Sequence, residues 1–299
     1  MLKRLDRDAK AKVIDLSAVR ASRKHVADLE NTLIRDETLA LLPPCFALYT
    51  LVQNHLSVIA EILLPLPPQH RFYDQFEVAK DLYTPEGPPI SPLTNSFYTN
   101  WAQYDVAFGL GRETLTTISI AVARKTGMNA VFLELAGKLA NSRCSVYEHR
   151  GTDGNTLLLR ELWTNREVRA LNATGYNGKL GEIWYTRLLP PNNKLPGVHV
   201  NFNTPYVMHP HTHLAHWLAS IERMLAKAKG GNPEQDFYNF MKFGPEPLYW
   251  TEYVFEAYSN HTDGMILLHG LPDQPETRPH SDAYQPDQDT HTARTQSKA

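Results

Sequence analysis

The first half of the chain carries apolar residues at intervals of three and four, which is the period of an α-helix. From Ser17 to Leu42 this spacing predicts one amphipathic helix, which Pro43 and Pro44 would end because proline cannot continue a helix. A second helix with a broad apolar face is predicted from Cys45 to Leu64. Three further helical segments are predicted at Asn95–Phe108, Thr114–Lys125 and Asn129–Ala140.

From residue 144 the pattern changes to short runs that alternate between apolar and polar residues, which is typical of strands. Asp153 and Gly154 form a hairpin turn signal between two of these runs. Short strands separated by such turns predict an antiparallel β-meander or a small barrel. The predicted strands are Ser145–His149, Thr156–Leu162, Glu167–Leu171, Glu182–Leu189 and Val198–Phe202.

The helical period returns after His209, and apolar residues line one face of a segment that ends near Gly230. Leu248–Tyr258 is rich in aromatic residues, and Met265–Leu268 is predicted to be a last short strand. The fold class predicted is α+β, with a helical layer, a central meander or barrel, and C-terminal helices packed on it. The predicted organisation is an N-terminal extension (1–16), a mainly helical region (17–143), a β-meander (144–208), a C-terminal helical region (209–271) and a disordered tail (272–299) that is poor in apolar residues.

Composition excludes several classes of function. The 299 residues include 30 Lys and Arg against 32 Asp and Glu, so the chain has no charge signal strong enough to predict nucleic-acid binding. The most apolar window, 39–66, is interrupted by prolines and polar residues, and we therefore expect no membrane span. The N-terminus lacks the apolar stretch of a signal peptide, which predicts a cytoplasmic protein.

Neither the cysteines nor any common catalytic motif indicates an enzyme class for this chain. Cys45 and Cys144 are too few for a disulfide framework or a four-thiolate zinc site. Cys144 begins a predicted strand, where a cysteine usually packs as a small apolar residue rather than acting as a nucleophile. Neither a G-x-S-x-G motif nor a phosphate-loop motif occurs.

A histidine cluster is the sharpest chemical feature of the sequence. His209, His211, His213 and His216 are four of the 13 histidines, and neutral imidazole is a common ligand of zinc. In an extended segment the first three would point to one side, whereas in a helix His213 and His216 would share a face. The cluster therefore predicts either a metal site, with zinc as the candidate cofactor, or a polar helix start whose histidines lie on the surface.

Two functions remain open. The absence of a strong catalytic motif favours a non-catalytic interaction protein with an unknown protein partner. The alternative is a metal-dependent hydrolase that uses the histidine cluster together with Glu252, Glu256 or Asp263.

The predicted strands carry both acidic and basic residues, which is typical of a solvated sheet face with cross-strand ion pairs. The competing interpretation is a reader of peptides or nucleic acid. Its stacking platforms would be Tyr147, Trp163, Trp184 and Tyr185.

The stretch from Phe97 to Pro191 resembles a module of uncharacterised bacterial proteins, some of which carry a SEC-C zinc motif at one end. No cysteine-rich zinc motif is present in this chain, so the resemblance implies the order of helices and meander but neither zinc nor an activity. The residues that carry the resemblance are Trp101 and Asp105, Ser145–Glu148, Leu159–Leu162, Gly181–Glu182 and Arg187–Pro190.

Overall fold

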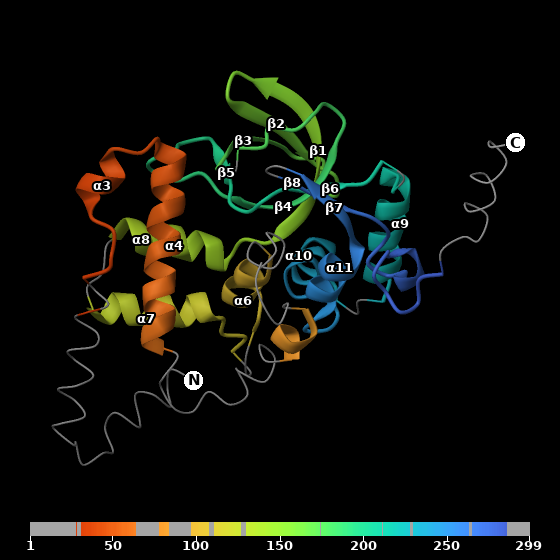
Figure 1. Cartoon of the computed structure of the whole chain (residues 1–299), viewed down its shortest axis with the longest axis horizontal. Coiled ribbons are helices and arrows are strands. Elements are labelled where there is room, and N and C mark those ends of the chain that lie inside the picture. The colour runs from red at the N-terminus through yellow and green to blue at the C-terminus, as the bar shows by residue number, and fades with distance from the viewer. Residues whose placement is uncertain are drawn as a thin grey trace, which may run out of the picture.

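A computed structural model describes residues 28, 31–63, 78–83, 97–107, 111–126, 130–173, 175–210, 212–227, 230–262 and 265–285. Helices lie on both sides of a strand-rich centre, which confirms the predicted α+β class (Figure 1). Among the described helices, none has both the length and the apolar composition needed to cross a membrane.

The N-terminal helices follow the predicted pattern except in residues 31–35 and 41–42, which are not helical, and in residues 78–83, where no helix is predicted. The described helices of this layer are α3 (Asp36–Ala40), α4 (Pro44–Leu63), α6 (Thr99–Tyr104), α7 (Leu115–Thr126) and α8 (Ala130–Ala140), and residues 78–83 are also helical. The predicted helix over 17–42 is wrong for residues 31–35, which form a turn and extended chain. The reason is Asn54 of α4, whose side chain accepts a hydrogen bond from the Ile34 N–H at 2.7 Å and donates one to the Thr32 carbonyl at 3.2 Å. Residues 17–27, 29 and 30 lie outside the described part of the chain.

Five strands close into a small barrel. These are β1 (Cys144–Asp153), β2 (Thr156–Glu161), β3 (Glu167–Asn172), β4 (Ile183–Leu189) and β5 (His199–Asn201). Their order is β1-β2-β3-β5-β4, and β1 pairs with β4 to complete the circle. Tyr147 of β1 lies opposite both Glu161 of β2 and Trp184 of β4. Of the two predicted forms the barrel is therefore right, although β3 and β5 are parallel and not antiparallel.

Three more strands extend the sheet beyond the barrel. They are β6 (Tyr206–Met208), β7 (Tyr258–Thr262) and β8 (Met265–Leu268); β6 pairs antiparallel with β4 and parallel with β8. Between β6 and β7 the chain forms α9 (Leu214–Leu225), α10 (Pro233–Phe243) and α11 (Tyr249–Ala257). The region 209–271 contains these helices, the predicted strand Met265–Leu268, which is β8, and one further strand, β7, that the sequence analysis does not predict.

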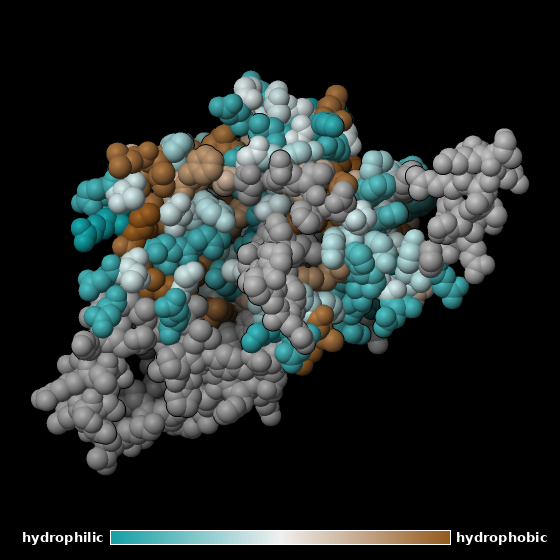
Figure 2. Space-filling model, in the orientation of Figure 1, coloured by the Kyte–Doolittle hydropathy of each residue, from teal (hydrophilic) through white to brown (hydrophobic). Residues whose placement is uncertain are grey.

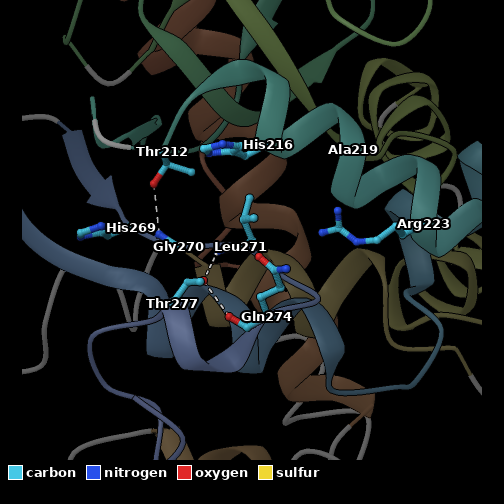
Figure 3. Close-up of a pocket in the computed structure, with 9 residues that line it drawn as sticks. All are labelled: Thr212, His216, Ala219, Arg223, His269, Gly270, Leu271, Gln274 and Thr277. Carbon is cyan, nitrogen blue, oxygen red and sulfur yellow. Dashed lines mark hydrogen bonds between the residues drawn. The ribbon is translucent and has the colours of Figure 1, made fainter. Parts of the chain in front are cut away.

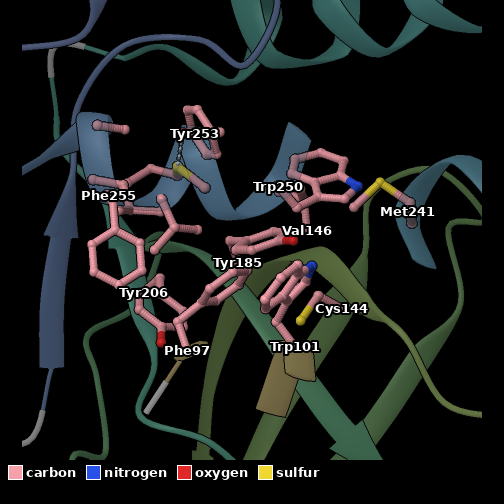
Figure 4. Packing of buried hydrophobic residues seen from close by; sticks show 14 of the residues in the cluster. Phe97, Trp101, Cys144, Val146, Tyr185, Tyr206, Met241, Trp250, Tyr253 and Phe255 are labelled. Carbon is pink, nitrogen blue, oxygen red and sulfur yellow. Dashed lines mark hydrogen bonds between the residues drawn. The ribbon is translucent and has the colours of Figure 1, made fainter. Parts of the chain in front are cut away.

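An aromatic core joins the barrel to the C-terminal helices (Figure 4). Tyr185 of β4 stacks on Trp250 of α11 at 5.2 Å between ring centroids, and Phe97 packs edge-on to Tyr206 of β6 at 5.7 Å. A second core lies between α4, α7, α8 and the ends of β4 and β5, and a third fills the barrel. The barrel thus contributes residues to all three cores.

A buried ion cluster ties α6, β4 and α10 together. Asp105, which follows α6, forms ion pairs with Arg187 of β4 and with Lys242 of α10, the latter at 3.4 Å. Both cations also donate to the Ser142 carbonyl, Arg187 at 3.0 Å and Lys242 at 2.7 Å. Asp105 and Arg187 are among the residues that carry the sequence resemblance. In the structure they form a buried ion pair that holds α6 and β4 together.

The C-terminal prediction needs correction. Residues 272–285 were predicted to be disordered, but Pro275–Thr277 forms a short 3-10 helix and Arg278 is 2% exposed. The Arg278 guanidinium donates to Glu252 and Glu256 of α11 and to the carbonyls of Leu271 and Pro272. The prediction relies on the low apolar content of this segment. The hydrogen bonds and ion pairs of Arg278 stabilise the segment in place of apolar contacts. Residues 286–299 lie outside the described part.

Candidate functional site

The three described histidines of the cluster lie in two separate ring contacts. His209 follows β6 and stacks on His269, which follows β8, with ring centroids 4.9 Å apart and an interplanar angle of 15°. His213 precedes α9 and His216 lies in its first turn; their rings meet edge-on at 5.5 Å. His269 could not be recognised from the sequence, because its proximity to His209 depends on the pairing of β6 with β8.

The predicted four-histidine metal site includes His211, which lies outside the described residues, so the complete site stays a prediction. Within the described part of the chain, no group of three or more His, Cys, Asp and Glu side chains is arranged to hold a metal ion.

The carboxylates proposed to complete that site have a different partner. Arg278 Nη1 donates to Glu252 at 3.0 Å and to Glu256 at 2.7 Å. Burial raises the pKa of Glu256, against the opposing effect of Arg278. Asp263, the third candidate, lies outside the described residues. Neither of the described carboxylates lines the pocket beside the histidines.

That pocket lies between one face of α9 and residues 269–277 and has a volume of about 370 Å³ (Figure 3). Its α9 side is formed by residues three or four positions apart, which therefore share a helix face. Its other side is the loop after β8, where Thr212 Oγ1 accepts a hydrogen bond from the Gly270 N–H at 3.1 Å. The lining residues are Thr212, His216, Ala219, Arg223, His269, Gly270, Leu271, Gln274 and Thr277.

An ion pair fixes the arginine of this pocket. Arg223 Nε donates to Asp273 Oδ2 at 2.7 Å, and Arg223 Nη2 donates to Asp273 Oδ1 at 3.0 Å. Ser220 also donates to Asp273. Burial alone would raise the pKa of Asp273, but the hydrogen bonds from Arg223 and Ser220 lower it. Asp273 is therefore held as a carboxylate that orients Arg223.

Cys144 packs in the aromatic core, as predicted. It is 5% exposed, and burial raises the pKa of its thiol. A thiol in such surroundings is a poor nucleophile because little thiolate is present near neutral pH.

The predicted stacking platforms are wrong. Tyr147, Trp184 and Tyr185 are buried, with at most 7% of each residue exposed. Trp163 is partly exposed, but its ring stacks on Phe237 of α10 at 5.0 Å. Because these rings belong to the cores, a base or peptide cannot stack on them.

The charges on the barrel strands pair with one another. Arg160 of β2 forms an ion pair with Glu148 of β1, Arg150 pairs with Glu148 within β1, and Arg169 of β3 pairs with Asp153 of β1 at 3.0 Å. This is the solvated, internally paired face that the mixed charges predicted.

An apolar groove lies on the opposite side of the molecule from α9. Leu41, Leu42 and Phe46 are 84%, 37% and 41% exposed, and Figure 2 shows apolar residues gathered over α3 and α4. The groove has a volume of about 500 Å³. Its lining comprises Asp36, Leu39, Ala40, Leu42, Pro44, Ala47, Leu48, Leu51, Val131 and Lys194.

Comparisons with protein-family models, with curated proteins and with solved structures found no match to this chain.

Proposed function

We propose that this protein is a non-catalytic interaction protein that binds an amphipathic helix of a partner protein in the groove of α3 and α4. The observation that carries the proposal is the exposure of Leu41, Leu42 and Phe46 beside an apolar groove. Single exposed apolar side chains are common on protein surfaces, but a contiguous group beside a groove is typical of an interaction site.

The energetics favour an apolar occupant. Most of the lining residues are apolar, and Leu39, Leu42 and Val131 are among them. An apolar side chain of a partner in the groove would therefore remove apolar surface of both proteins from water. Each Å² of apolar surface removed from water contributes about 25 cal/mol. Leucine and phenylalanine anchors of a partner would gain most of their binding free energy in this way.

The charges at the groove indicate which apolar occupant fits. Asp36 and Lys194 are the ionisable residues of the lining, and they have opposite sign. A helix with apolar residues three and four positions apart, a basic residue opposite Asp36 and an acidic residue opposite Lys194 complements this pattern.

The hydrolase alternative has less support. It requires a carboxylate beside the histidines, whereas Glu252 and Glu256 bind Arg278. His211 and Asp263 lie outside the described residues, so no observation favours that function over the interaction.

A displayed library of random peptides tests the proposal, with the full chain as bait. We expect the enriched peptides to share an amphipathic helical pattern with the two charges described above. They should bind the Leu42→Asp/Phe46→Asp variant at least tenfold more weakly than the wild-type protein. Leu180→Asp is the matched control, because Leu180 is 74% exposed and lies in a barrel loop away from the groove.

Two results would overturn the proposal. One is a selection that yields no such pattern, or peptides that bind the double variant as well as the wild type. The other is a dimer in sedimentation that the double substitution dissociates, since the occupant would then be a second copy of this chain.

A further inference from the structure

The pocket beside α9 lies where two parallel strands end. β6 and β8 are neighbours in the sheet, and each is followed by one histidine of the His209–His269 stack. The carboxyl ends of parallel strands are a frequent position for ligands, because the loops that follow them diverge and leave a hollow. Here the hollow is bounded by α9 on one side and by residues 269–277 on the other.

Nitrogen donors point into this pocket. Arg223 uses Nε and Nη2 for Asp273, and its Nη1 makes no hydrogen bond with the described residues. Figure 3 shows Arg223 and Gln274 extending toward each other from opposite sides, and His216 lies above them. Arginine and amide N–H groups at one hollow favour a ligand with acceptor oxygens.

The lining offers an anion hydrogen-bond donors and no carboxylate that would repel it. The pocket is lined by an arginine and two histidines, and no aspartate or glutamate is among its lining residues. Asp273, which is not among the lining residues, accepts hydrogen bonds from Nε and Nη2 of Arg223 and from Ser220. It therefore orients Arg223 and leaves Nη1 for a ligand.

The size and the walls of the pocket limit the ligand further. A volume of about 370 Å³ is near the lower end of small-molecule sites, which span about 300–1,000 Å³. Ala219, Gly270 and Leu271 offer apolar wall without polar side chains. A bare ion would leave this wall in contact with water, whereas a short hydrocarbon body would cover it.

We infer that the pocket between α9 and residues 269–277 binds a small organic anion, with a carboxylate or phosphate group held by Arg223, His216 and Gln274 and a short apolar body against Ala219 and Leu271. This site is separate from the groove of α3 and α4, and it uses different residues.

Calorimetric titration of the full chain tests the inference with three probes. Pentanoate and inorganic phosphate represent the two anionic groups, and pentanamide is the neutral analogue of pentanoate. We expect one of the anions to bind at millimolar concentration or below. Pentanamide should bind at least tenfold more weakly than pentanoate if the carboxylate is the recognised group. If phosphate is the tighter ligand, the recognised group is phosphoryl.

The variants separate this site from general ion binding. Ala219→Leu fills the pocket and keeps every donor, so it should abolish binding without removing a charge. Arg223→Gln should weaken binding at least tenfold. His213→Gln is the matched control, because His213 is an exposed histidine of the same segment that does not line the pocket, and it should bind as the wild type does. The inference fails if neither anion binds, if pentanamide binds as tightly as both anions, or if Ala219→Leu binds like the wild type.

Discussion

At the scale of single residues, the cluster of Asp105, Arg187 and Lys242 buries three charged groups at a high cost in desolvation. Arg187 and Lys242 are fully or nearly buried and share one carboxylate, so the cluster places two cations against one anion. Burial lowers the pKa of Lys242 from 10.5 to about 8, although Asp105 acts in the opposite direction. The lysine is therefore the member of the cluster that can lose its charge most readily.

This pKa predicts a dependence of stability on pH. Between pH 8 and pH 10.5 the unfolded chain holds a proton on Lys242 that the folded chain has lost. The contribution of this group to stability is therefore complete above pH 10.5 and is lost as the pH falls through about 8. Relative to Lys242→Met, the wild-type free energy of unfolding should rise by about 2 kcal/mol between pH 7.5 and pH 9.5, as measured by urea denaturation.

Comparing the wild type with the variant removes the effect of the other titrating groups, since both chains share them. Parallel pH profiles for the two proteins would contradict the prediction, because they would mean that the folded state does not lower the lysine pKa.

At the scale of elements, the segment 272–285 acts as a strap across α9 and α11. Asp273 binds Arg223 of α9, and Arg278 binds Glu252 and Glu256 of α11. Arg278 is 2% exposed, so removing it would leave two partly buried carboxylates with no cation between them.

Truncation tests the role of this strap. A chain that ends at Leu271 should be less stable than the full chain by about 1–3 kcal/mol, because it loses the hydrogen bonds of Arg278 and Asp273 while the carboxylates left behind are partly open to solvent. A chain that ends at Gln285 keeps the strap and loses only a polar segment, and its melting temperature should stay within about two degrees of the wild type. Thermal melts of the three chains measure both effects. Equal melting temperatures for all three would show that the strap contributes nothing.

Local signals explain which elements could be predicted from the sequence. Helix α4, Pro44–Leu63, lies within one residue of the predicted Cys45–Leu64, and the alternating strands of the barrel lie close to their predicted bounds. Helix α10 was missed, although Asn232 before Pro233 is a helix-start signal, and Asn232 does accept hydrogen bonds from Glu234 and Gln235 N–H groups. Trp184 lies within the predicted strand Glu182–Leu189 and is buried.

The features of the fold and of the pocket that could not be predicted depend on contacts between distant parts of the chain. Strands β6 and β7 have only 3 and 5 residues and lack an alternating pattern, so their pairing partners define them. The parallel pairing of β3 with β5 and the contact of His209 with His269 also depend on the tertiary fold. The pocket side chains Arg223 and Gln274 could not be recognised for the same reason.

At the scale of the whole molecule, strand β4 connects the three cores. Tyr185 belongs to the aromatic core, Leu189 to the core of the N-terminal helices, and Trp184 to the interior of the barrel. Loss of any one core would therefore expose part of the same strand. This predicts one cooperative unit and not separate helical and barrel domains.

Two spectroscopic signals can test this cooperativity. Trp101, Trp163, Trp184, Trp217 and Trp250 are the 5 tryptophans of the chain, and each belongs to or packs against the aromatic core or the barrel core. Their fluorescence reports on those cores, whereas far-ultraviolet circular dichroism also reports on α4, α7 and α8. We expect both signals to give the same urea midpoint. Midpoints that differ by more than about 0.5 M would indicate that the helical layer unfolds by itself.

The position of β8 in the chain also has a consequence for synthesis. While the polypeptide is being made, β6 can pair with β4, but its other edge waits for β8, which follows α9, α10 and α11. An unpaired strand edge is prone to pair with other chains, so the nascent protein passes through an aggregation-prone stage. His269, Leu271 and Gln274 follow β8, and the pocket beside α9 therefore forms only when the last strand has docked. A small molecule bound there would stabilise only the fully folded protein. It would therefore favour the completion of folding over the aggregation of partly folded chains.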